Sequence, residues 1–140
     1  MVALSAVLTA RTPWGRRLSD TLAALIGPLP LSACLALAAA SGLVEEALFR
    51  GLLQDWVGWL PASLLFGLAH YAPGRGLWPW TLFSIGAGLV LGALYAHTGN
   101  LVAPAVAHFG INAVNLPLLA RRVPSADAGD RVDLDLGAQR

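Results

Sequence analysis

Two long stretches of this 140-residue chain lack charged side chains, which restricts the folds open to it. Residues 21–44 carry no formal charge, and residues 76–120 carry none apart from the titratable His97 and His108. Each stretch exceeds the roughly 20 residues that an α-helix needs to cross a bilayer. The pattern lacks the two-residue alternation of a membrane β-strand, so we expect the spanning elements to be helices.

The composition also indicates lipid as the main solvent. Hydrophobic residues make up 56% of the chain and charged residues 12%, and the mean hydropathy of +0.65 lies outside the usual range of soluble domains. The net charge is only +1, and no basic patch with interleaved aromatic residues occurs, so a nucleic-acid partner has no support. The single cysteine, Cys34, lies in an apolar run and is interpreted as a packing residue.

Prolines and glycines divide the apolar region into four predicted helices, at residues 31–57, 61–72, 78–97 and 101–120. The expected fold class is therefore all-α: a polytopic membrane helix bundle with about four core transmembrane helices. The helix at 61–72 is the shortest and would reach only about 18 Å. It is expected to begin earlier, continue past Tyr71, tilt or be re-entrant.

The chain divides into three parts by composition. Residues 1–30 form an N-terminal segment that could be the stump of upstream helices, residues 31–120 form the helical core, and residues 121–140 are predicted to be a disordered polar tail. If all four core helices cross, most arginines fall on one side of the membrane. The positive-inside bias then makes that side, and both termini, cytoplasmic.

Three charged side chains interrupt the helix predicted at 31–57, in the sequence VEEALFRG. Glu46 and Arg50 are four residues apart, so they share one helix face and can form an ion pair that supports the geometry. Glu45 lies on another face and has no local cation. It is a candidate general base, and the alternative is a protonated glutamic acid that bonds a neighbouring helix.

Two further groups of polar residues lie on other predicted helices. The sequence FGLAH places Phe66 and His70 on one face of its helix, and HFGIN places His108 and Asn112 on one face of another, which Asn115 extends. Each polar group costs insertion free energy. Three helices that direct such groups into one small bundle therefore favour a shared active site.

Small residues recur at every fourth position of the helix at 78–97: Ser84, Gly88, Gly92 and Ala96. Such a face lets helix backbones approach closely in lipid. It predicts packing inside the chain against the helices at 31–57 and 101–120, or alternatively the seam of a homo-oligomer.

The three polar sequences resemble a known family. EEALFR, FGLAH and HFGIN reproduce, in order, the EExxxR, FxxxH and HxxxN motifs of the CPBP family, which includes CAAX prenyl endopeptidases and bacterial relatives linked to bacteriocin processing or self-immunity. The resemblance covers roughly residues 31–120. It implies a glutamic-type intramembrane endopeptidase that acts on a peptide or membrane-protein substrate in a bacterial cytoplasmic membrane.

The resemblance also implies roles for individual residues. Glu45 and His70 would activate a water molecule, His108 and Asn112 would stabilise the oxyanion, Glu46 and Arg50 would support them, and no cofactor would be needed. One alternative is a zinc protease with Glu45, His70 and His108 as ligands, although the sequence lacks an H-E-x-x-H motif. A second alternative is a non-enzymatic membrane immunity or interaction protein that retains the fold.

Overall fold

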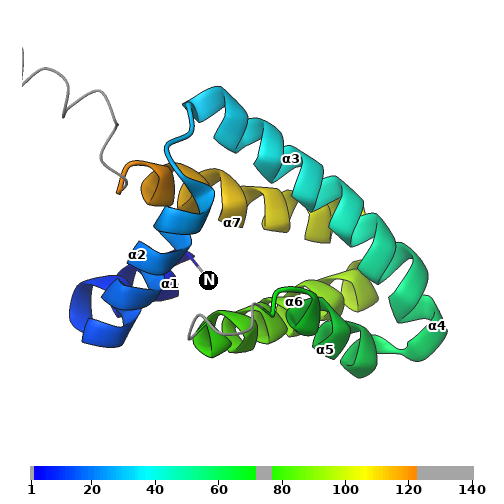
Figure 1. Cartoon of the computed structure of the whole chain (residues 1–140). Coiled ribbons are helices and arrows are strands. Elements are labelled where there is room, and N and C mark those ends of the chain that lie inside the picture. The colour runs from blue at the N-terminus through cyan, green and yellow to red at the C-terminus, as the bar shows by residue number, and fades with distance from the viewer. Residues whose placement is uncertain (1, 72–76, 123–140) are drawn as a thin grey trace, which may run out of the picture.

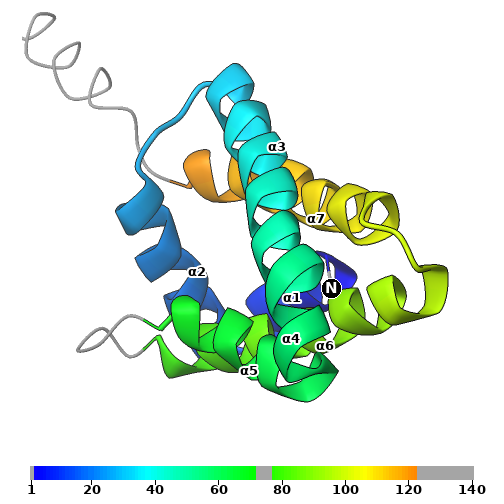
Figure 2. The same ribbon diagram turned by 90° about the vertical axis from the view of Figure 1, so that its right-hand side faces the viewer.

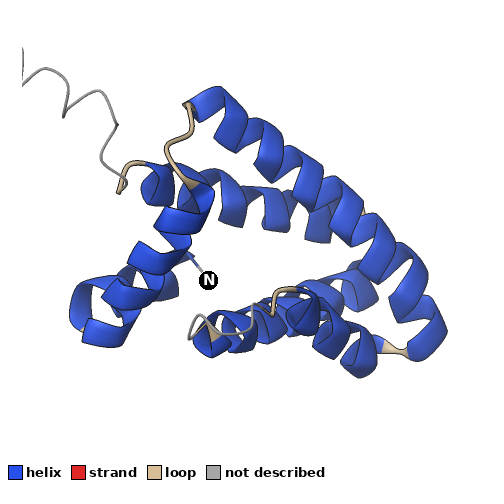
Figure 3. Ribbon diagram, in the orientation of Figure 1, coloured by secondary structure: helices blue, strands red, loops and turns tan. Residues whose placement is uncertain are grey.

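The regular structure of this protein is entirely helical wherever its computed structural model describes the chain, at residues 2–71 and 77–122 (Figure 3). The predicted all-α class is therefore confirmed. The polar tail predicted at 121–140 falls outside the described residues from position 123 onward. The elements are α1 (Val2–Arg11), α2 (Pro13–Ile26), α3 (Leu31–Leu48), a π-helical segment η1 (Phe49–Gln54), α4 (Asp55–Val57), α5 (Trp59–Ala69), α6 (Trp78–Thr98) and α7 (Val102–Ala120).

Two pairs of helices form the bundle, and α3 connects them. The helix α3 packs along α7, α5 packs along α6, and η1 at the end of α3 contacts both α5 and α6 (Figure 1). Figure 2 shows α3 running from its crossing with α7 towards α5. Side chains that point inward from α3 and η1 can therefore reach α5, α6 and α7.

The N-terminal segment forms a helical hairpin, α1 and α2, that packs against α7. The break between the two helices follows from two adjacent residues. Thr12 accepts a hydrogen bond from the Gly15 amide at 3.0 Å, and Pro13 occupies the first helical position, where its missing N–H costs nothing.

Three of the described helical stretches are long and apolar enough to cross a membrane: Leu31–Val57, Trp78–Thr98 and Val102–Ala120. The fourth expected span is α5, which has 11 residues. At a rise of about 1.5 Å per residue it reaches roughly 16 Å, about half of the hydrocarbon thickness. It begins at Trp59, two residues earlier than predicted, and ends at Ala69, so the expected continuation past Tyr71 is wrong.

The turns expected around Gly58 and Gly99 are present. Gly58 has φ of 87° and Gly99 has φ of 65°, both in the left-handed region that side chains with a Cβ rarely adopt. The Gly99 amide bonds the Tyr95 carbonyl and so closes the C-terminus of α6. The reversal at Gly58 folds the short α5 back beside η1.

The small-residue face of α6 is used inside the chain. A Cβ added at Gly88 would lie 2.9 Å from the Ser63 carbonyl oxygen, and one added at Gly92 would lie 2.8 Å from Oε1 of Gln54. The partners of these two glycines are therefore η1, which lies in the helix expected at 31–57, and α5, which was not an expected partner. Close approach also exposes two α6 carbonyls to side chains of η1: Arg50 donates to the Gly88 oxygen and Gln54 to the Gly92 oxygen.

This packing predicts that Gly88→Ala lowers stability while Gly86→Ala, the same change two residues away on the same helix, does not. A Cβ added at Gly86 would meet no atom of the described residues within 4 Å. We expect Gly88→Ala to cost about 1–3 kcal/mol through overpacking. The measurement is the thermal midpoint of unfolding of both variants in detergent, and equal midpoints would contradict the assigned α5–α6 contact.

Candidate active site

The ion pair between Glu46 and Arg50 is buried at the junction of α3 and η1. Oε1 of Glu46 lies 2.8 Å from Nη1 of Arg50, and each side chain is only 1% exposed. Arg50 also donates from Nη2 to the Gly88 carbonyl on α6 at 3.0 Å. Buried charges require such pairing and hydrogen bonding, so this pair holds α3 and η1 against α6.

Glu46 has a second partner on α7. The same oxygen, Oε1, lies 2.7 Å from Nδ1 of His108, a residue that is 62 positions away in the sequence. A carboxylate accepts, so the Nδ1 atom donates and Nε2 is the ring nitrogen left for other contacts. The spacing of Glu46 and Arg50 predicted their pairing, but no local pattern could predict the contact between Glu46 and His108.

Phe66 lies between the charged pair and both histidines. The Arg50 guanidinium carbon lies 4.5 Å from the centre of the Phe66 ring, a cation–π contact. The ring centre lies 4.9 Å from that of His70 and 5.7 Å from that of His108. Helical spacing predicts Phe66 only as a neighbour of His70, whereas its buried ring packs against three polar residues of the site.

Glu45 and His70 approach each other across α3 and α5. Oε2 of Glu45 lies 3.7 Å from Nε2 of His70, and the side chains are 30% and 25% exposed. This separation is too long for a direct hydrogen bond, but both atoms are within reach of one water that lies beside them. The Phe66 carbonyl lies 2.8 Å from Nδ1 of His70 and can only accept, so Nε2 is the nitrogen that faces Glu45.

Asn112 is held from α3 as well. Its Nδ2 donates to Oγ of Ser41 at 2.7 Å, and Ser41 in turn donates to the Ala38 carbonyl at 3.2 Å. Asn115, which was expected to extend the polar face of α7, accepts a hydrogen bond from Ser5 on α1 at 3.0 Å. The polar residues of α7 therefore face both α3 and the N-terminal hairpin.

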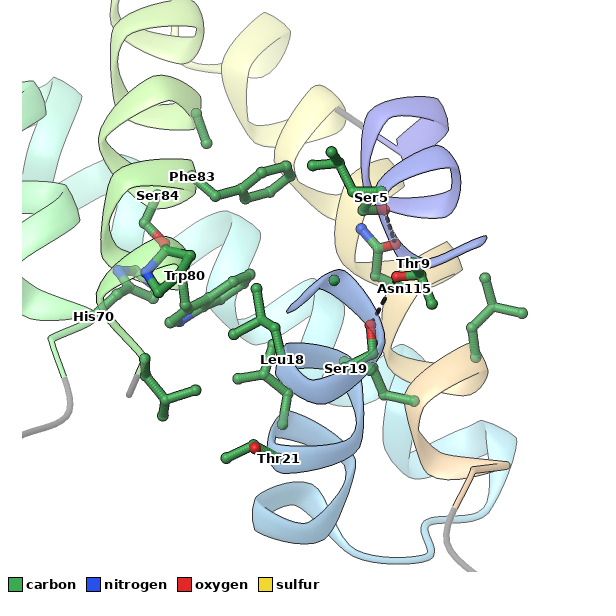
Figure 4. Close-up of a pocket in the computed structure, with 18 of the residues that line it drawn as sticks. Ser5, Thr9, Leu18, Ser19, Thr21, His70, Trp80, Phe83, Ser84 and Asn115 are labelled. Atoms are coloured by element: carbon green, nitrogen blue, oxygen red, sulfur yellow. Dashed lines mark hydrogen bonds between the residues drawn. The ribbon is translucent and has the colours of Figure 1, made fainter. Parts of the chain in front are cut away.

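A cavity of about 1450 Å³ lies between the α1–α2 hairpin and helices α5, α6 and α7. His70, His108 and Asn112 all line it, and Glu45 adjoins it through His70. Figure 4 shows the stacked rings of Trp80 and Phe83 on the α6 wall, with Leu18 of α2 facing Trp80. Hydroxyl groups of the hairpin line other parts of the cavity: Ser5, Thr9, Ser19 and Thr21.

The alternative zinc ligands are not grouped as a metal centre in this arrangement. Glu45 and His70 are neighbours, and His108, whose Nδ1 bonds Glu46, keeps Nε2 for other contacts. Across residues 2–71 and 77–122, no three His, Cys, Asp or Glu side chains are grouped so that they could hold a metal ion. Three protein ligands are the usual minimum of a catalytic zinc site.

Comparison with known proteins gave one curated relative, an uncharacterised protein of Bacillus subtilis (strain 168) called YpbD. The two sequences are 46% identical over 72 residues, which are 50% of this chain and 36% of the relative. The match thus spans little more than a third of that protein's length. No solved structure matches the chain.

A family match covers more of the chain. The sequence profile described as "Type II CAAX prenyl endopeptidase Rce1-like" matches residues 27–114, a range that runs from the turn before α3 into α7. It contains the three polar motifs and the serine that contacts Asn112. The chain therefore belongs to the Rce1-like family of type II CAAX prenyl endopeptidases.

Proposed function

We propose that this protein is an intramembrane endopeptidase that hydrolyses a peptide bond at or within the bilayer. Membership of the family and three helices of spanning length make it an integral membrane protein of a protease family. The observation that carries the finer proposal is the pairing of Glu45 with His70 beside a cavity that His108 and Asn112 also line.

Glu45 and His70 activate the hydrolytic water. Oε2 of Glu45 is buried and has no hydrogen-bond partner among the described residues, so it has a free lone pair towards Nε2 of His70. A water that lies beside both atoms loses a proton to this pair as its oxygen attacks the scissile carbonyl carbon. When the tetrahedral intermediate collapses, the C–N bond breaks, the pair returns the proton to the leaving amine, and the other product is a carboxylic acid.

His108 and Asn112 stabilise the oxyanion that forms when the carbonyl π electrons move onto oxygen. They lie one turn apart on α7, so both can donate to one point in the cavity. With Nδ1 of His108 bonded to Glu46, donation from Nε2 requires an imidazolium. Together with the Arg50 guanidinium, its positive charge balances the carboxylates of Glu45 and Glu46.

Both termini are proposed to lie on the cytoplasmic side of a bacterial cytoplasmic membrane. Arg122 at the end of α7 bonds Asp20 of α2 at 3.0 Å, which joins the arginine-bearing hairpin to the arginine-bearing end of α7. Clustering of arginines at one end of the bundle supports this orientation through the positive-inside bias. The Bacillus relative supports a bacterial membrane.

The central prediction separates the two adjacent glutamates. Glu45→Gln should abolish cleavage at normal membrane abundance, because the amide cannot accept the proton of water. Glu46→Gln should lower abundance or the thermal midpoint, because it leaves Arg50 and His108 without a buried counter-charge, a type of loss that costs about 3–5 kcal/mol. The measurement is comparative proteomics of membranes that contain wild type or each variant, to find peptides whose processing depends on Glu45.

Asp55→Asn is the matched control, since it makes the same kind of change on the same continuous helix. Asp55 accepts a hydrogen bond from Tyr95 in an exposed position and does not line the cavity. The Asp55→Asn variant should therefore cleave the same peptides as wild type, to the same extent. Equal residual activity in the Glu45 and Glu46 variants would overturn the assignment, and the lack of any Glu45-dependent processing would favour a non-enzymatic protein.

A further prediction concerns metal. If the carboxylate–imidazole pair alone activates water, cleavage should survive dialysis against a strong chelator, and purified protein should contain well under one zinc per chain. The measurements are elemental analysis and the rate of cleavage before and after stripping. Stoichiometric zinc whose removal and return track activity would overturn the metal-free mechanism.

A further inference from the structure

Ser41 forms a short chain of hydrogen bonds that ends at the Asn112 amide. The Ser41 hydroxyl donates to the Ala38 carbonyl at 3.2 Å, and Oγ accepts from Nδ2 of Asn112 at 2.7 Å. Asn112 lies on the cavity wall, whereas Ser41 does not line the cavity. Ser41 is also one helical turn before Glu45 on α3, so both side chains face the same direction.

The direction of this chain determines which end of the amide faces Ser41. A hydroxyl has one proton, and here it is used by a backbone carbonyl, so Oγ can only accept. Asn112 must therefore present its NH₂ group and not its carbonyl oxygen. Nδ2 carries two protons, and the second remains for a group in the cavity.

The same logic applies to the other donor on α7. Oε1 of Glu46 receives Nδ1 of His108 at 2.7 Å, just as Oγ of Ser41 receives Nδ2 of Asn112 at 2.7 Å. Two acceptors on α3 thus orient two residues on α7 as donors. Without Ser41, the Asn112 amide is free to turn over and direct its carbonyl oxygen into the cavity, where it would repel an oxyanion.

We propose that Ser41 is a positioning residue that orients Asn112 as an oxyanion donor. This inference rests on the proposed hydrolytic function. Ser41→Ala should lower kcat with little change in KM, because the lost interaction is made only in the transition state. We expect a loss of about 10- to 100-fold, smaller than the 10²- to 10³-fold loss that removal of an oxyanion donor causes.

The test of activity uses a peptide whose processing depends on Glu45. Ser41→Thr keeps the hydroxyl and should restore most of the rate that Ser41→Ala loses. The matched control is Ser63→Ala on α5, where a buried hydroxyl makes a similar bond to the Trp59 carbonyl but contacts no residue of the site by a hydrogen bond. It should retain the wild-type rate.

A double-mutant cycle separates positioning from a general structural role. If Ser41 acts through Asn112, Ser41→Ala should reduce the rate in wild type but have almost no further effect in an Asn112→Ala background. Equal losses in both backgrounds would overturn the proposal. So would a wild-type rate for Ser41→Ala, while the water-activating roles of Glu45 and His70 would then remain intact.

The hydrogen bond can also be measured without a substrate. In ¹⁵N-labelled protein in detergent, the side-chain NH₂ signals of Asn112 are identified by their loss in Asn112→Asp. One of the two protons should resonate downfield in wild type and in Ser41→Thr, and should move upfield in Ser41→Ala. Unchanged Asn112 signals in Ser41→Ala would overturn the proposal independently of catalysis, whereas a complete lack of Glu45-dependent cleavage would overturn the proposed function.

Discussion

One buried carboxylate oxygen holds together the helices on which the site depends. Oε1 of Glu46 accepts from Arg50 one turn along its own helix and from His108 on α7. Arg50 extends this cluster to the Gly88 carbonyl on α6 and to the face of the Phe66 ring on α5. Charges in so apolar a surrounding are costly unless they are paired, so the cluster favours one relative arrangement of the four helices.

The two α7 residues proposed as oxyanion donors and the pair proposed to activate water depend on that arrangement in different ways. His108 is a member of the cluster, and Asn112 follows one turn later and is bonded by Ser41 of α3. His70 contacts the cluster through the ring and the carbonyl of Phe66. Glu45 has no direct bond to the cluster, and Oε2 of its partly exposed side chain faces His70, as the proposed activation of water requires.

Glycines of α6 make the cluster geometrically possible. Helices α5 and η1 lie so close to α6 that a Cβ at Gly88 or Gly92 would collide with them. At this distance, the Arg50 and Gln54 side chains reach backbone carbonyls of α6 that already accept hydrogen bonds within the helix. The close packing and the burial of charge are thus one feature: neither would be stable in lipid without the other.

The sequence by itself determined the helical class, the membrane solvent and the residue types of the site, because uncharged runs and helical spacing are local properties. The pairing of Glu46 with Arg50 follows from a four-residue spacing in the same way. Tertiary structure decided that α6 packs on α5 and η1, that α5 ends at Ala69, and that Glu46 and Ser41 each hold one α7 donor. These contacts join residues 62 and 71 positions apart, and no local pattern encodes them. They form because an unpartnered buried polar group costs free energy, and only the packed bundle determines which partner lies within reach.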